Sequence, residues 1–214
     1  MTYAPHMAAA LSGATVRQLA HWRKSAEKHA VLVPEVSATR PILYSFRDVV
    51  ALRTCVYLRK DSPLQRIRRA LGNLRDLGEV EHLSRYKLVS VDGSIALMTP
   101  EAAVDLVKQP GQFYMAAMSD VLASFTNKSD VKIPDLLHPR AHIEVDPEIR
   151  LGHPVIAGTR VPYEQVASLV ADGVPANEIE LYYPSVDAAA ARDAAAFATY
   201  VDSWRPKERQ NTAA

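Results

Sequence analysis

The apolar residues of this chain recur at helical spacing in short segments, and a glycine or a proline closes nearly every segment. Glycine and proline end helices rather than continue them, so the pattern predicts several short helices joined by turns. With β-prone stretches between them, we expect a mainly α chain with short β elements. The expected helices cover residues 7–14, 15–24, 45–60, 63–77, 163–173, 176–183 and 187–204.

The first helices have recognisable ends. Gly13 supplies a tight turn after the first helix, and Thr15 is placed to cap the second, which is the pattern of a helix-turn-helix. Ser45 and Asp48 form a capping-box-like start for the third helix. Residues 31–46 are β-prone, contain two prolines and are too long for a simple helix–helix link, so they predict a two-stranded wing.

The middle of the chain changes character. Residues 86–91 and 94–99 alternate like two strands, and Asp92-Gly93 between them is typical of a hairpin turn. The remaining patterns predict a helix at 100–109, either a strand or a helix at 113–125, and a polar linker at 127–134.

A length of 214 residues favours two domains over one. We expect a winged helix-turn-helix at 1–82 and a small β-containing middle segment at 83–135. The third part, 136–214, is expected to be a helix-turn-helix-like domain of three helices with a basic tail.

The two ends of the chain carry opposite charge. Residues 1–90 hold 15 Lys and Arg against 7 Asp and Glu, whereas residues 91–214 hold 10 against 17, and the net charge of the whole is +1. This asymmetry suggests two modules with different partners. A basic first half favours a polyanion such as nucleic acid, although a solvated basic face would have the same composition.

Composition narrows the class of protein. Apolar residues make up 48% and charged residues 23%, as in an ordinary soluble protein. No window approaches 18 uninterrupted apolar residues, and no basic stretch precedes the first apolar run, so we expect neither a membrane span nor a secretory signal. Cys55 is the single cysteine and cannot form an internal disulfide, which fits the reducing cytoplasm.

The N-terminal residues resemble a MerR-type winged helix-turn-helix over about residues 4–78. The resemblance rests on Gly13-Ala14-Thr15, Leu19, Trp22, Arg40, Tyr44-Ser45, Asp48-Val49 and Leu52. It implies that the second helix enters the major groove of DNA while wing residues hold phosphates. The candidate DNA contacts are then Arg17, Arg23, Lys24, Arg40 and Tyr44, although Arg17 and Arg40 also read as plain surface charge.

The C-terminal pattern runs from Gly152 to Pro162, with Gly158-Thr159-Arg160 inside it, and continues to Tyr183-Pro184. It resembles the family catalogued as domain of unknown function 433, over about residues 140–204. Together with the basic N-terminal module, it makes the chain look like a VapB-type antitoxin, whose expected toxin is a PIN-like ribonuclease. The candidate toxin-binding residues are Arg160, Arg205, Lys207 and Arg209. Arg160 is alternatively structural, bridging carbonyl groups or a carboxylate such as Glu164.

We therefore expect a non-enzymatic antitoxin whose N-terminal module binds operator DNA and whose C-terminal half silences a toxin. The protein is expected to bind DNA as a homodimer, with the apolar segment 83–125 forming the dimer contact. A stand-alone transcription regulator and a structural interaction protein remain alternatives. No nucleophile and base occur in a supporting pattern, and Pro139 breaks the helical spacing of His138 and His142, so no catalytic residue, metal or cofactor is expected.

Overall fold

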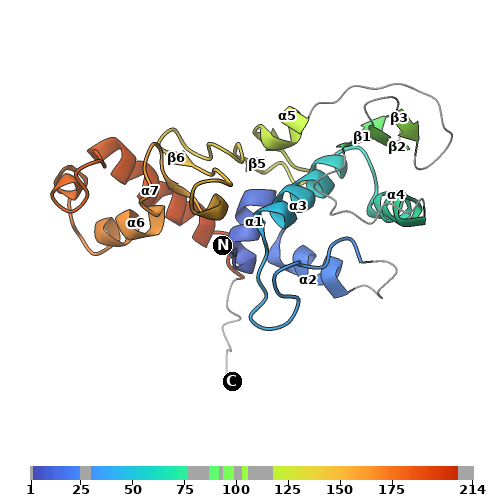
Figure 1. Ribbon diagram of the computed structural model, residues 1–214, viewed down its shortest axis with the longest axis horizontal. Coiled ribbons are helices and arrows are strands. Elements are labelled where there is room, and N and C mark those ends of the chain that lie inside the picture. The colour runs from blue at the N-terminus through green and yellow to red at the C-terminus, as the bar shows by residue number, and fades with distance from the viewer. Residues whose placement is uncertain are drawn as a thin grey trace, which may run out of the picture.

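A computed structural model of the chain describes residues 2–24, 30–76, 87–91, 94–98, 103–105 and 118–206. This described part is mainly helical with small antiparallel sheets, which confirms the predicted fold class at that level. Figure 1 shows the C-terminal helices at one end, the N-terminal helices in the middle and a three-stranded sheet at the other end.

The first two helices, α1 (Pro5–Ser12) and α2 (Val16–Lys24), meet at the predicted glycine turn. Gly13 has φ +81° and its N–H donates to Ala9 O, which ends α1. Thr15 and Gln18 then cap α2 reciprocally, because the N–H of each donates to the side-chain oxygen of the other, at 2.8 and 3.2 Å. The predicted roles of Gly13 and Thr15 are confirmed.

Helix α3 (Phe46–Leu58) begins at a capping box in which Ser45 and Asp48 each accept from the backbone of the other. Asp48 also accepts from the N–H of Glu35, so it ties the preceding loop to the helix. In that loop, Ser37 and Leu43 exchange two backbone hydrogen bonds, and no regular two-stranded ladder forms around them. The predicted wing is thus a loop with a single bridge, since its prolines lack the N–H that a ladder needs.

Helix α4 (Leu64–Asp76) precedes a sheet of β1 (Lys87–Val91), β2 (Ser94–Met98) and β3 (Ala103–Asp105), which pair antiparallel in that order. The predicted hairpin is confirmed, although its Asp92-Gly93 turn lies outside the described residues. The predicted helix at 100–109 is wrong for β3, where Val104 pairs with Leu97 across the sheet. Cross-strand pairing outweighs the helical spacing of this short segment.

The predicted linker at 127–134 is also wrong. After the short helix α5 (Met118–Leu122), strands β4 (Phe125–Thr126) and β5 (Lys132–Ile133) form a hairpin that packs into the protein. Asn127 organises its turn: the side-chain oxygen accepts from Ser129 and Val131, and the amide donates to Gly13 O. Ile133 is 0% exposed, so a polar composition here conceals one residue that anchors the hairpin in the core.

The C-terminal third holds the hairpin β6 (Ile143–Glu144) and β7 (Val155–Ile156), then α6 (Tyr163–Ala171), the 3₁₀ helix η3 (Ala176–Leu181) and α7 (Ala188–Asp202). Asp187 caps α7 by accepting from Ala190 N–H at 2.8 Å. Helix α7 packs against α6 through Phe197, whose ring meets that of Tyr163 edge to face at 4.8 Å.

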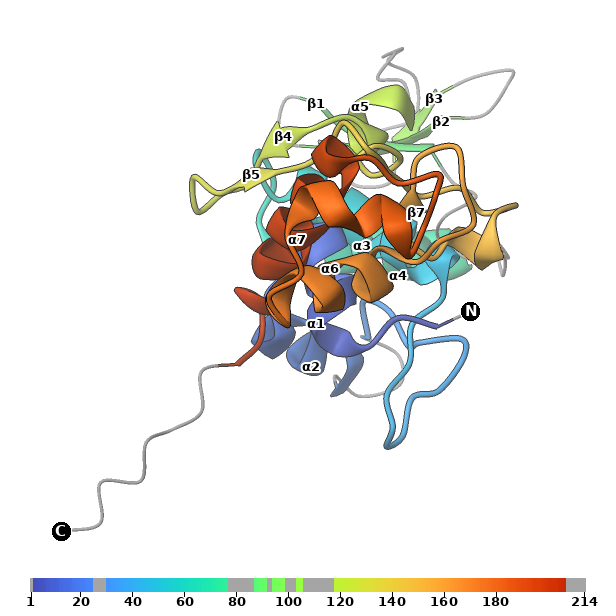
Figure 2. The ribbon, with the colours of Figure 1, turned by 90° about the vertical axis from the view of Figure 1, so that its left-hand side faces the viewer.

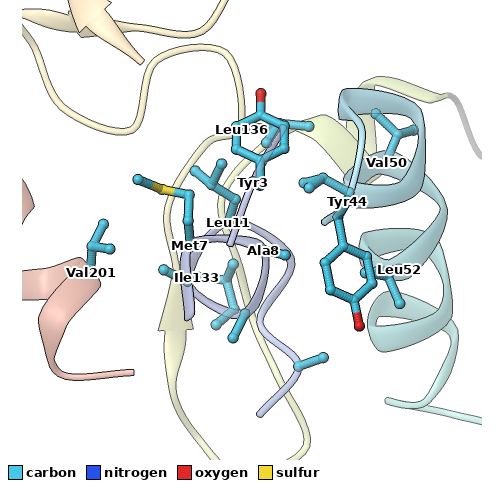
Figure 3. Close-up of a cluster of buried hydrophobic side chains, with 14 of the residues drawn as sticks. Tyr3, Met7, Ala8, Leu11, Tyr44, Val50, Leu52, Ile133, Leu136 and Val201 are labelled. Carbon is cyan, nitrogen blue, oxygen red and sulfur yellow. The ribbon is translucent and has the colours of Figure 1, made fainter. Parts of the chain in front are cut away.

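Helix α1 is the common support of both halves of the chain. Figure 3 shows it between Val50 and Leu52 of α3 on one side and Val201 of α7 on the other, with Ile133 close by. Tyr200 of α7 donates to Ala10 O at 2.9 Å. Together with α3, β5, α6 and α7, this helix contributes to one continuous core.

Arg53 in the middle of α3 is the largest buried charge of the described residues, with a side chain that is 0% exposed. Its guanidinium donates to the carbonyl oxygens of Leu11, Val121, Leu122, Ala123 and Pro134. The group also lies 4.9 Å from the ring centre of Phe125. Burial lowers the pKa of Arg53 to about 10, so it keeps its charge at neutral pH.

We expect Arg53→Met to lower the free energy of unfolding by about 3–5 kcal/mol, because it leaves several carbonyl oxygens without a donor in the core. Urea unfolding followed by circular dichroism measures this loss. The matched control is Arg47→Met on the same helix, where an exposed ion pair to Glu35 at 3.7 Å is lost at a cost below about 1 kcal/mol. A loss below about 1 kcal/mol for Arg53→Met, no larger than that of the control, would show that the buried guanidinium is dispensable.

Candidate nucleic-acid and partner interfaces

Helix α2 presents one buried face and one polar face. Leu19 and Trp22 are 2% and 1% exposed and hold the helix against the core. Arg17 and His21, one turn apart, are exposed. His21 Nε2 lies 3.1 Å from the guanidinium of Arg68 on α4, so α4 lies beside α2 at this point. The predicted contact Arg17 is therefore accessible to a partner.

Tyr44 is not available as a wing contact. Its side chain is 1% exposed, and its backbone bridges to Tyr3 through two hydrogen bonds of 2.7 and 3.0 Å. Burial raises the pKa of its phenol, while the nearby half-buried Arg23 opposes that rise. The ring completes the core beside α1 (Figure 3), which corrects its predicted DNA contact.

Arg40 lies exposed in the loop between α2 and α3. In Figures 1 and 2, which view the molecule from directions 90° apart, this loop and α2 lie on the same lower side. Lys24 ends α2, and its side chain lies outside the described residues.

The glycine-rich C-terminal motif is a structural turn. Gly152 and Gly158 have φ of +84° and +72°, as expected of positions that favour glycine. Thr159 closes the turn, because its hydroxyl donates to Ile156 O at 2.8 Å and accepts from Val161 N–H at 3.0 Å.

Gly152 also joins the two halves of the chain. The hydroxyl of Tyr3 donates to Gly152 O, and a Cβ at this position would lie only 3.0 Å from that hydroxyl and from the ring of Phe46. A side chain at residue 152 would separate these groups. The motif therefore docks the C-terminal third on the N-terminal helices.

Arg160 is exposed and makes no ion pair with another described residue. Its predicted partner Glu164 instead lies 2.8 Å from His153 Nε2. The pairing of Arg160 with Glu164 is therefore not present, and the Arg160 side chain is exposed.

The C-terminal end of α7 carries Arg205, whose Nε lies 2.6 Å from Asp202 Oδ1 in an exposed ion pair. A surface pair of this kind contributes little and is readily exchanged for another anion. Lys207 and Arg209, the other predicted tail contacts, lie outside the described residues.

Titratable groups of the described region form no cluster of three or more metal-binding side chains. His142 Nδ1 lies 2.7 Å from Asp193 Oδ2, and His138 is exposed. Cys55 is fully buried, and burial raises the pKa of its thiol to about 12. Among the helices that the structure describes, none has the length and apolar character needed to cross a membrane.

Comparisons with known proteins find a family similarity in the C-terminal region and a similar fold in a solved structure. Residues 143–198 match a family described as protein of unknown function (DUF433). The crystal structure of Rv2018 from Mycobacterium tuberculosis is similar, with a TM-score of 0.52 and 16% identity, over 90% of this chain and 96% of that one. At this identity the likeness concerns the fold alone. A comparison with curated proteins gave no significant match.

We expect Cys55 to be alkylated at pH 8 about a thousandfold more slowly in the folded protein than in the unfolded one. Burial raises the pKa of its thiol from 9.0 to about 12, so the reactive thiolate is rare. Mass spectrometry after timed iodoacetamide treatment measures the rate, with the Cys55→Ala variant as the unlabelled control. Fast labelling of folded protein would contradict the burial of this residue.

Proposed function

We propose that this protein is an antitoxin that binds operator DNA through its N-terminal helices and neutralises a PIN-like ribonuclease through its C-terminal half. The exposed basic face of α2, anchored by a buried apolar face, is the single observation that carries the DNA half of the proposal. The match of residues 143–198 to DUF433 supports the second half.

The DNA half follows from the surface of α2 and its neighbours. Leu19 and Trp22 fix the helix, leaving Arg17 and His21 exposed on the other side. Arg40 on the adjoining loop adds a second exposed cation. Guanidinium groups form bidentate hydrogen bonds with phosphates and with guanine edges, so this surface fits duplex DNA.

The toxin half follows from the unpaired cation of the C-terminal turn and the basic end of the chain. Arg160 is exposed without an ionic partner among the described residues, and Arg205 is held only by a surface pair. PIN-like nucleases hold catalytic metal with a carboxylate cluster, which a basic segment can neutralise by matching its charge. We place Arg160, Arg205, Lys207 and Arg209 at this interface.

The proposed homodimer uses the middle segment, residues 83–125. Within it, the sheet of β1, β2 and β3 lies at the end of the molecule opposite α6 and α7 (Figure 1), clear of the proposed toxin interface. Paired operator half-sites lie roughly 34 Å apart along DNA, which a two-fold dimer matches.

A stand-alone transcription regulator is the alternative, and the same basic surface on α2 favours it. The two functions differ in one observable. An antitoxin copurifies with a nuclease encoded beside it, whereas a regulator does not.

We expect Arg17→Ala and Arg40→Ala each to weaken binding to upstream operator DNA about tenfold, because each removes a phosphate or base contact. Each should also reduce the slope of log affinity against log salt by about 0.9 where a phosphate is lost. Fluorescence anisotropy with labelled DNA measures both. Tyr44→Phe is the matched control and should leave affinity unchanged, since its phenol is buried. Undiminished binding by both arginine variants would reject α2 as the reading helix.

We expect the full-length chain to inhibit the neighbouring nuclease, and deletion of residues 205–214 to relieve this inhibition by removing the basic segment. Cleavage of labelled RNA at fixed nuclease concentration measures it, with Arg160→Ala tested alongside. Lys132→Ala, an exposed cation on β5, is the control for loss of charge alone. Full inhibition by the shortened chain would reject the role of the tail, and no association with the nuclease would reject the toxin half.

A further inference from the structure

A cavity of about 380 Å³ opens where the two halves of the chain meet. The α1–α2 turn, the end of α3, the β4–β5 hairpin and the end of α7 each contribute to its wall. Its lining includes Thr15, Gln18, Arg59, Lys128, Tyr200 and Trp204. Cavities of this size at such junctions are typical of small-molecule sites.

The wall of the cavity is positively charged. Arg59 and Lys128 are its charged residues, and no carboxylate lies among the side chains that line it. The half-buried Arg59 guanidinium rests 6.0 Å from the ring centre of Trp22 and makes no hydrogen bond or ion pair with any described residue. Asp202 on the neighbouring turn of α7 is engaged by Arg205. A half-buried cation without a counter-charge favours an anionic ligand.

The rest of the lining is apolar and aromatic. Val56 and Val131 stand among the residues of the wall, together with the rings of Tyr200 and Trp204, which meet edge to face at 6.1 Å. The Tyr200 hydroxyl is already bound to Ala10 O, so the ring is fixed in place. A wall of this kind suits a flat apolar body better than a bare inorganic ion.

We propose that this cavity binds a small planar organic anion, a carboxylate or a phosphate ester, with its charge at Arg59 and Lys128 and its flat body against Trp204. None of the proposed DNA and toxin contacts is among the residues that line the cavity. Binding itself therefore stands independently of the proposed function.

The site also reaches the start of the DNA-binding helix. Thr15 and Gln18 line the cavity and cap α2 reciprocally. A ligand that hydrogen-bonds to either side chain competes with this capping, and Arg59 links the cavity to Trp22 on the buried face of α2. Occupancy therefore changes the affinity for DNA, an effect that rests on the proposed function.

The test uses 1-naphthoate and 1-naphthyl phosphate as anionic probes and 1-naphthamide as the uncharged counterpart. We expect the backbone signals of Thr15, Gln18 and Ser129 in nitrogen–proton correlation spectra to shift saturably with one or both anions, and not with the amide. Shifts with one anion alone identify the preferred acid group. Shifts at other positions only, no saturable shift below about 5 mM, or equal binding of the amide would each overturn the site, since the charge is worth at least tenfold in affinity.

Substitutions of Arg59 and Lys128 test which cation binds the acid group of the probe. Arg59→Gln should weaken binding of the better probe about tenfold and Lys128→Gln about threefold, because the first cation is half-buried and the second exposed to solvent. Lys132→Gln, on the same hairpin but outside the lining, is the control and should leave affinity unchanged. Unchanged spectra elsewhere in each variant show that it is folded. Equal affinities across the three variants would overturn the assignment.

Anisotropy with labelled DNA, at saturating probe, then tests the coupling. We expect a change of at least about threefold in DNA affinity, which Arg59→Gln abolishes at the same probe concentration. A probe that binds in the spectra but leaves DNA affinity unchanged would overturn the coupling and retain the site. Absence of DNA binding without the probe would instead count against the proposed function.

Discussion

The buried guanidinium of Arg53 is the interaction on which the fold depends. It satisfies carbonyl oxygens from the end of α1, from the end of α5 and from Pro134 after the β4–β5 hairpin. These groups have few other donors, because they stand where helices and strands stop. A planar cation with five donors can serve several such ends at once, which no neutral side chain can do. The segments that Arg53 joins are far apart in the chain. The same hydrogen bonds therefore also hold residues 121–134 against helices α1 and α3.

The consequence is a molecule whose two charged halves share one core. Helix α1 has α3 on one side and α7 on the other, and the Tyr200–Ala10 hydrogen bond and the Tyr3–Gly152 hydrogen bond connect the same parts again. Glycine at residue 13 allows the β5 residue Ile133 to approach, since a Cβ there would lie 2.7 Å from it. The opposite charges of the halves therefore do not mark two loosely tethered modules, and a partner of one half acts on a body that includes the other.

Local chemistry made much of this fold predictable, and tertiary burial explains the rest. The turn at Gly13 and the cap at Thr15 depend on neighbouring residues alone, and both were expected correctly. Arg53 and Tyr44 were not recognised as core residues, because arginine within a helix and tyrosine within a wing usually lie at the surface. The 127–134 segment was predicted as a linker because its composition is polar, and Ile133 is its one buried residue. Of the proposed contacts, exposure could be expected for Arg17, whereas the cavity at Arg59 arises from four segments that no local pattern brings together.

A shared core has an energetic implication for the two proposed interfaces. A rigid body transmits nothing by itself, because a ligand shifts an equilibrium only by the difference of its affinity for two states. The helix that a ligand in the cavity reaches at its start is α2. Its start is held by one reciprocal side-chain cap, and its buried face meets the rest of the protein through Leu19 and Trp22. We expect a ligand bound at the junction of α1, the β4–β5 hairpin and α7 to act first on the Thr15–Gln18 cap. Thr15 and Gln18 stand at that junction, so the coupling proposed between the cavity and the DNA-binding surface would act through them, in both directions and by the same factor.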